Sequence, residues 1–282
     1  MKITNKHNLP NVFVEMATKH NYPFSTKTLS VSKLSMPPQE IVLRERLDEY
    51  LEQDVSEMFN LFIGSALHEF IEKYEDSKFS EKYLSCIVND QKITGRIDNY
   101  DEKSQTVIDY KTAKVSTVQN GRFDSWDLQG KLYAWLLMKN GIIVDNIKFY
   151  AILKDWDTIT KSFKGNSYPQ EPIFIYEKKI RSDDLQEIQK FVEHKVDSVL
   201  KMKKMSTDEI LETELPEKFQ KITKYAIKEH GKSRAKQVTE DKEYAEWYCN
   251  RNDNYYVEKR HEENFNYNMT CKAIQLAKKI RR

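Results

Sequence analysis

Three residues whose side chains could bind a metal or take part in catalysis lie in two short segments of the chain. The segment GRID ends in Asp98, and the segment DYK places Asp109 two residues before Lys111. Side chains alternate along a β-strand, so Asp109 and Lys111 are expected on the same face. If the intervening hairpin turns at Lys103 and Ser104, Asp98 falls opposite Asp109. The sequence therefore predicts two carboxylates that face each other beside a lysine.

This arrangement favours a bound cation, because like charges directly opposite each other on a sheet cost about 0.2–1 kcal/mol. Carboxylates and water suit a hard divalent ion such as Mg²⁺ or Mn²⁺, and phosphate oxygens could complete its shell. Lys111 would then orient or activate an attacking water and offset charge in the transition state. The alternative is an exposed hairpin on which Asp98, Asp109 and Lys111 are merely solvated.

The elements around these residues follow from the spacing of apolar residues. We predict strands over residues 83–88, 92–100 and 106–112, separated by turn-forming residues and arranged as an antiparallel meander. A substantially buried amphipathic helix is expected before them, over residues 56–74. A helix over 126–139 and a strand over 146–154 follow, and then a strand near 173–176 and a helix from 182 to about 202.

Each helix beside the meander carries two polar or small residues four positions apart, and therefore on one face. Gly64 and His68 form the pair on the first helix, with the glycine permitting a close approach, and Gln129 and Tyr133 form the pair on the second. Each pair also has an ordinary interpretation. A lone histidine is more often a core or helix-end residue than a ligand, and Gln129 and Tyr133 could be a polar rim and a core aromatic.

The four motifs together, in this order, resemble a known family. GSALH, GRID, DYK and QGKLY are similar to the motif series of RecB-type nucleases in the PD-(D/E)XK superfamily, which reads G-x-x-x-H, G-x-x-D, D/E-x-K and Q-x-x-x-Y. The resemblance implies an α/β (α+β) fold with a restriction-endonuclease-like core. In such a fold a central mixed sheet is flanked by helices, with helical additions at the N- and C-termini.

The resemblance also implies a role for each motif residue. Catalysis would involve Lys111, Asp109 and Asp98. A metal would be held by His68, Asp98, Asp109 and the carbonyl of Tyr110, with Gln129, Tyr133 and Gly64 contacting DNA or supporting the site.

The implied activity is that of a Mg²⁺- or Mn²⁺-dependent deoxyribonuclease, with exonuclease action in DNA recombination, repair or phage replication as the first expectation. A structure-specific or restriction-type endonuclease and a DNA-binding accessory subunit are the alternatives. DNA is the expected partner, together with a helicase, a single-strand-binding protein or a recombinase.

The cysteines predict that no iron–sulfur cluster is present, although many RecB-type exonucleases carry one. In those proteins the first cysteine follows a serine-rich turn and precedes a proline, and here Met36 occupies that place before Pro37. Cys249 and Cys271 are too few to complete a set of four thiolates, and Cys86 lies far from them in the sequence.

The amino-acid composition excludes several other classes of protein. The 282 residues are 12% aromatic and carry a net charge of +2, which excludes a disordered chain. Lack of a long apolar run predicts no membrane span, and the odd number of spaced cysteines fits a reducing cytoplasm.

The charge is unevenly distributed along the chain. Residues 217–282 contain 16 Lys and Arg against 10 Asp and Glu, which suits a polyanionic partner or a solvated helical surface. The expected organisation is an N-terminal helical region over 1–55, the nuclease core over 56–205 and a basic helical region over 206–282 that packs on the core.

Overall fold

The computed structural model describes residues 1–19, 23–74, 79–213, 222–239, 242–251, 254–262 and 271–281. They belong to two compact units, Met1–Met205 and Ser206–Arg282. No helix among the described residues is long and apolar enough to cross a membrane.

The first unit begins with β1 (Lys2–Thr4), α1 (Asn11–Lys19), β2 (Thr28–Ser30), α2 (Val31–Leu34), α3 (Pro38–Arg46), β3 (Glu52–Asp54) and α4 (Phe59–Tyr74). It continues with β4 (Tyr83–Val88), β5 (Gln91–Arg96), β6 (Asn99–Asp101), β7 (Thr106–Ala113), α5 (Val115–Gln119), α6 (Asp124–Lys139), β8 (Asn146–Leu153), α7 (Thr158–Lys164), β9 (Ile173–Lys179) and α8 (Ser182–Lys203).

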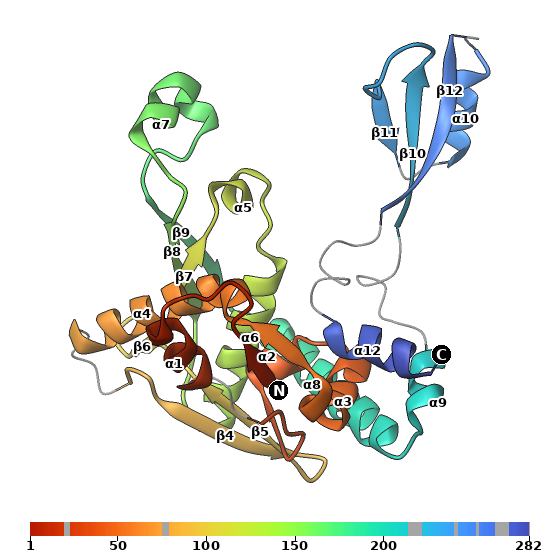
Figure 1. The fold of residues 1–282 in the computed structure, drawn as a ribbon. Coiled ribbons are helices and arrows are strands. Elements are labelled where there is room, and N and C mark those ends of the chain that lie inside the picture. Colours follow the sequence, from red (N-terminus) through yellow and green to blue (C-terminus); the bar gives the residue numbers. More distant parts are fainter. Residues whose placement is uncertain are drawn as a thin grey trace. The chain divides into compact units, whose positions relative to one another are not determined.

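The larger sheet is mixed and has the strand order β6-β7-β8-β9. β7 pairs antiparallel with β6 and parallel with β8, and β9 is antiparallel to β8. Asn99 lies opposite Ile108 and Asp101 opposite Thr106, so the hairpin turns at Lys103 and Ser104, as predicted. α7 lies at the far end of the long β8–β9 connection (Figure 1).

A second sheet has the order β2-β5-β4, so the predicted three-strand meander is wrong. The β4–β5 hairpin turns at Asn89 and Asp90, whose φ angles of 46° and 61° suit a two-residue hairpin turn. The predicted strand over 92–100 is broken between β5 and β6. There Ile97 is fully buried, and Asp98 accepts a hydrogen bond from the backbone N–H of Tyr110.

α6 lies at the centre of the first unit and contacts β4, β5, β7 and β8. Its run from Leu132 to Leu137 is buried almost completely, and the indole N–H of Trp135 donates to Gln189 Oε1 of α8 at 2.7 Å. A Cβ added to Gly130 would lie 2.6 Å from Ile147 Cδ1 of β8. This glycine therefore sets how closely α6 approaches the sheet that carries the acidic residues.

α4 forms where the sequence predicts a helix, but the prediction that it is substantially buried is wrong. Phe62 is its single buried residue, whereas Phe59 and Phe70 are 60% and 62% exposed. The reason is that the helix contacts β7 with part of its surface and lines a cleft with another part. The spacing of apolar residues predicts which side chains share a face of the helix. It does not predict whether another element covers that face.

The N-terminal region is not purely helical, because it also contributes strands. β1 pairs parallel with β3, and β2 pairs parallel with β5, extending the second sheet. Each of these N-terminal strands is three residues long, too short for an alternating pattern to be visible in the sequence.

The second unit also contains a sheet where the sequence predicts helices. Its elements are α9 (Thr207–Glu212), β10 (Ile222–Glu229), β11 (Gln237–Thr239), α10 (Lys242–Cys249), β12 (Tyr255–Glu262) and α12 (Lys272–Ile280). The strands pair antiparallel in the order β11-β10-β12, and α10 packs against them. Interspersed charges hide the alternation of β10 and β12, and one such pair joins the two strands through Lys228 Nζ and Glu258 Oε2, 3.0 Å apart.

Candidate active site

A cleft of about 550 Å³ opens where α4, the β5–β6 junction, β7 and α6 meet. It brings together seven of the eight residues that the sequence singles out for the site: Gly64, His68, Asp98, Asp109, Lys111, Gln129 and Tyr133. The eighth, Tyr110, does not line the cleft, and its ring stacks on Tyr150 with the ring centroids 5.8 Å apart. Tyr110 contributes its backbone N–H, which donates to Asp98 Oδ2 at 2.8 Å.

Asp109 is the most deeply buried acid of the cleft, with its side chain 3% exposed. Gln129 Nε2 donates to its Oδ1 at 3.1 Å. Its Oδ2 forms an ion pair with Lys111 Nζ at 2.5 Å. Burial raises the pKa of Asp109, and the positive charge of Lys111 opposes that rise. One carboxylate oxygen is thus fixed by an amide, while the other keeps capacity to bind a cation.

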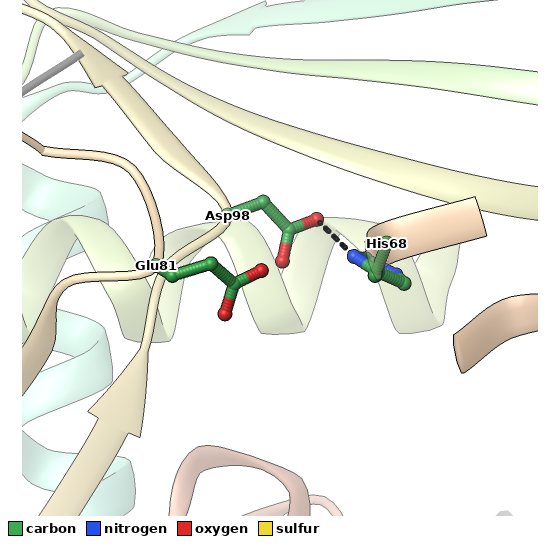
Figure 2. A group of neighbouring side chains, drawn as sticks. All are labelled: His68, Glu81 and Asp98. Carbon is green, nitrogen blue, oxygen red and sulfur yellow. Dashed lines mark ion pairs between the residues drawn. The ribbon is translucent and has the colours of Figure 1, made fainter. Parts of the chain in front are cut away.

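Asp98 sits in the break between the two sheets, beside His68. His68 Nδ1 lies 3.5 Å from Asp98 Oδ2, and the two side chains point toward each other in Figure 2. Burial, followed by the negative charge of Asp109, raises the pKa of Asp98 to about 7. The donated N–H of Tyr110 and the charge of Lys111 oppose this shift without cancelling it.

His68 projects from α4 into the same cleft. Burial lowers the pKa of His68, and this effect exceeds the opposing pull of the Asp109 charge. A lowered pKa favours the neutral imidazole at neutral pH, and the neutral ring is the form that coordinates metals.

Glu81 is a cleft residue that the motifs in the sequence do not include. Its backbone N–H donates to the carbonyl of Asp98 at 3.0 Å, and its Oε2 lies 2.7 Å from Arg96 Nε. Burial raises the pKa of Glu81, with the nearby positive charge of Arg96 opposing the shift. The β4–β5 register, extended two residues beyond Tyr83 and Arg96, sets Glu81 against Asp98. The hairpin turn at Asn89 and Asp90 is the sequence signal that points to this pairing.

Gly64 and Tyr133 complete the walls of the cleft. A Cβ added to Gly64 would meet no atom within 4 Å, so the expected close approach is not to another part of the described chain. The glycine leaves free space inside the cleft instead. Tyr133 Oη lies 3.5 Å from Gln129 Nε2, and burial and the Asp109 charge raise the pKa of its phenol well above the usual range.

The donor set of the cleft fits a hard divalent cation. The ligand atoms of His68, Glu81 and Asp98 all lie within 4.8 Å of one another. Figure 2 shows these three side chains grouped together. Asp109 adds its buried Oδ2, which is ion-paired with Lys111 and has further lone pairs for a cation. The carboxylate oxygens suit a hard divalent cation, whereas the imidazole is a ligand that transition metals accept more readily than Mg²⁺. A bound cation would relieve the mutual repulsion of the acids.

Cys86, the cysteine of the first unit, does not line this cleft. None of the three cysteines, all of which lie within the described residues, forms a disulfide; Cys86 lies on β4 in the first unit, and Cys249 and Cys271 belong to the second unit. The carbonyl of Met36, where a cluster cysteine would stand, accepts a hydrogen bond from Lys195 Nζ at 2.9 Å. The expected lack of an iron–sulfur cluster stays a prediction.

The mixed sheet, its flanking helices and the opposed acids beside a lysine agree with a match to a family model. The model of the PD-(D/E)XK nuclease superfamily matches residues 31–216, and the chain belongs to that superfamily. Nucleases of this superfamily generally use divalent metals, and the acidic group described above is a candidate site for one.

Two solved structures resemble this chain over part of its length. The crystal structure of SSO0001 has 18% sequence identity and a TM-score of 0.45, over 66% of this chain and 83% of that one. A phage-related exonuclease from Haemophilus somnus 129PT has 13% identity and a TM-score of 0.29, over 68% of this chain and 82% of that one. A comparison with curated proteins gave no match.

Proposed function

We propose that this chain is a Mg²⁺- or Mn²⁺-dependent deoxyribonuclease of the RecB type that acts as an exonuclease in DNA recombination, repair or phage replication. The observation that carries the proposal is the pairing of Asp109 and Lys111. The Oδ2 of a buried carboxylate lies 2.5 Å from an ammonium group, on the wall of a cleft that Asp98 and His68 also line.

The proposed roles follow from these contacts. Asp98, Asp109 and His68 would hold the cation, with the carbonyl of Tyr110 or the carboxylate of Glu81 as a further ligand. A divalent cation bound there would act as a Lewis acid on a phosphoryl oxygen. Gln129 fixes Asp109 by donating to Oδ1, so that Oδ2 is presented to the cation.

Lys111 has two proposed tasks at the reacting phosphate. Its ammonium group lies next to the metal-binding acids, where it can donate a hydrogen bond to a phosphate oxygen as negative charge develops. It can also orient the attacking water. Tyr133 keeps its proton because its pKa is raised, so it can act only as a neutral hydrogen-bonding group in the wall of the cleft.

The test uses Asp109→Ala and Lys111→Ala with end-labelled linear DNA and closed circular DNA, in Mg²⁺, in Mn²⁺ and in chelator. Wild type should degrade linear DNA with either metal and leave circles intact, whereas each variant should lose at least about a hundredfold in rate. Cleaved circles would replace the exonuclease with an endonuclease. Rapid cleavage in chelator, or by either variant, would refute the proposed active site.

A further inference from the structure

A second cleft of about 430 Å³ adjoins the catalytic one and carries only positive formal charge. We call it the basic cleft, and its polar lining consists of Asn60, Thr112, Lys114, Thr117, Arg122, Ser125 and Lys154. Three of these side chains are cationic, three carry hydroxyl groups, and none is a carboxylate. Such a lining selects for an anion with several acceptor oxygens.

Parallel pairing of β7 and β8 brings the cations together. Ala113 is in register with Leu153, and the backbone N–H of Lys154 donates to the carbonyl of Ala113 at 3.0 Å. The residues that follow, Lys114 and Lys154, therefore leave the sheet at the same edge. Arg122 reaches this edge from the loop before α6, where its backbone N–H donates to the carbonyl of Thr117 at 3.0 Å.

The three cations of this cleft form no ion pair with a side chain of the described residues. Lys114 and Arg122 are exposed, and neither forms an ion pair within the described part of the chain. Lys154 Nζ donates to the neutral amide oxygen of Asn60. Asp155 is the nearby acid; its Oδ1 accepts the backbone N–H of Val115 at 2.7 Å, and it does not line the cleft. Three cations around a cleft whose lining holds no acid are favoured when water or an anion lies among them.

The basic cleft adjoins the catalytic cleft. Asn60 lines both of them and is hydrogen-bonded to Lys154. Lys114 follows Lys111 by three residues, which is about 10 Å at the rise of an extended strand. Successive phosphates of one strand of a duplex are about 3.4 Å apart along the axis, so this distance corresponds to a few nucleotides.

We propose that the basic cleft binds a second phosphate of the nucleic-acid substrate, a few nucleotides from the phosphate that reacts. The inference rests on the proposed function, because it takes a nucleic acid as the ligand of the catalytic cleft. The guanidinium of Arg122 offers a planar pair of donors, and Thr112, Thr117 and Ser125 offer hydroxyl groups. The phosphate is either an internal phosphodiester or a terminal phosphate group, and both have this chemistry.

The test measures binding without turnover. Affinity for a fluorescent oligonucleotide is measured by anisotropy in Ca²⁺ or in chelator, over a range of salt, for Lys114→Gln, Arg122→Gln and Lys154→Gln. Each variant should weaken binding by about tenfold, as expected for removal of a charged hydrogen bond, and should lower the salt slope by about 0.7 on single strands. Lys103→Gln is the matched control, since Lys103 is an exposed lysine in the turn at the opposite end of β7.

Oligonucleotides with 5′-phosphate, 3′-phosphate or hydroxyl ends distinguish the two sources. A loss of affinity confined to one phosphorylated end would identify a terminal phosphate, and an equal loss on all ends would identify an internal phosphodiester. Variants that bind with the affinity and salt slope of Lys103→Gln would overturn the inference, as would a wild-type chain that binds no oligonucleotide.

The same variants separate this inference from the nuclease proposal. A chain that binds DNA through the basic cleft but never cleaves it would refute the nuclease activity alone. A chain that cleaves DNA with unchanged KM in all three variants would refute the basic cleft alone. Melting temperatures within about a degree of wild type are expected, because the substituted side chains lie on the surface and pack in no core.

Discussion

Asp98 and Asp109 oppose each other with both carboxyl groups largely buried, and this geometry disfavours the folded protein when no cation is bound. Both pKa values are raised, chiefly by burial, and for Asp98 the charge of Asp109 adds to the effect. A raised carboxyl pKa means that the unfolded chain loses its proton more readily. Stability is therefore lost as pH rises from the unfolded value near 3.8 through about 7, and the full cost applies above that range.

The first prediction is that Asp98→Asn melts at a higher temperature than wild type in chelator at pH 8. The asparagine side chain would keep an oxygen to accept the N–H of Tyr110 but would remove the charge, for a gain on the order of 2 kcal/mol. The gain should shrink as pH falls toward 4. Thermal unfolding followed by circular dichroism measures it.

Metal addition provides the internal comparison for this variant. Mg²⁺ or Mn²⁺ should raise the melting temperature of wild type more than that of Asp98→Asn, because a ligand stabilises the state that binds it. An Asp98→Asn protein that is less stable than wild type in chelator at pH 8 would show that the opposed acids carry no such cost.

At the scale of elements, Gly64 of α4 and Gly130 of α6 are expected to respond in opposite ways to substitution by alanine. A Cβ at Gly130 would lie 2.6 Å from Ile147 Cδ1 and 3.2 Å from Ile147 Cβ, whereas a Cβ at Gly64 meets nothing within 4 Å. Overpacking costs about 1–3 kcal/mol, and replacing glycine by alanine within a helix contributes about 0.5–1 kcal/mol of stability.

We therefore predict that Gly130→Ala is less stable than wild type by about 1–2 kcal/mol and that Gly64→Ala is more stable by about 0.5–1 kcal/mol. Urea unfolding of both variants measures the two changes, and each serves as the control of the other. Gly64→Ala should also reduce cleavage, since Gly64 lines the catalytic cleft. Equal stability of the two variants would mean that α6 can move away from β8 without cost.

Hairpin register is the part of the fold that the sequence predicts best. The turn at Lys103 and Ser104 predicts the pairing of β6 with β7, and Asn89 and Asp90 mark the other turn. The same arithmetic applied at that second turn leads to Glu81. The turn residues fix which positions face each other, and two-residue alternation then fixes which side chains share a face.

Two features of the fold cannot be predicted from sequence patterns. The passage of the chain from one sheet to the other at Ile97 depends on how α6 packs beneath Gly95, whose added Cβ would lie 2.8 Å from Leu136 Cδ2. The exposure of α4 depends on the cleft that it lines. Both are long-range effects, and neither leaves a local signal in spacing or composition.

At the scale of the whole molecule, the lysines that give residues 217–282 their excess of positive charge differ in their contacts. Lys232 Nζ lies 2.8 Å from Glu229 Oε2, and Lys236 donates to Tyr255 Oη at 3.1 Å. These two are engaged within the second unit, so they are poor probes of a polyanion surface. Lys259, Lys278 and Lys279 are exposed and form no ion pair among the described residues.

The last prediction is that the triple variant Lys259→Glu, Lys278→Glu and Lys279→Glu binds DNA more weakly than wild type and with a smaller salt slope. Removing one phosphate contact lowers the slope of log affinity against log salt by about 0.9 on duplex DNA, so the slope reports the number of contacts as well as the change in charge. Titrations at several salt concentrations, followed by anisotropy, give both quantities.

The matched control reverses three exposed lysines that lie away from the catalytic cleft, Lys92, Lys103 and Lys179. Both triple variants have the same net charge, so a general repulsion of DNA would weaken both equally at long range. A loss of affinity confined to the first variant, with the maximal cleavage rate nearly preserved, would place phosphate contacts on the second unit. Equal losses of affinity and equal salt slopes in the two variants would show that the lysines of the second unit make no specific phosphate contacts and are only a solvated surface.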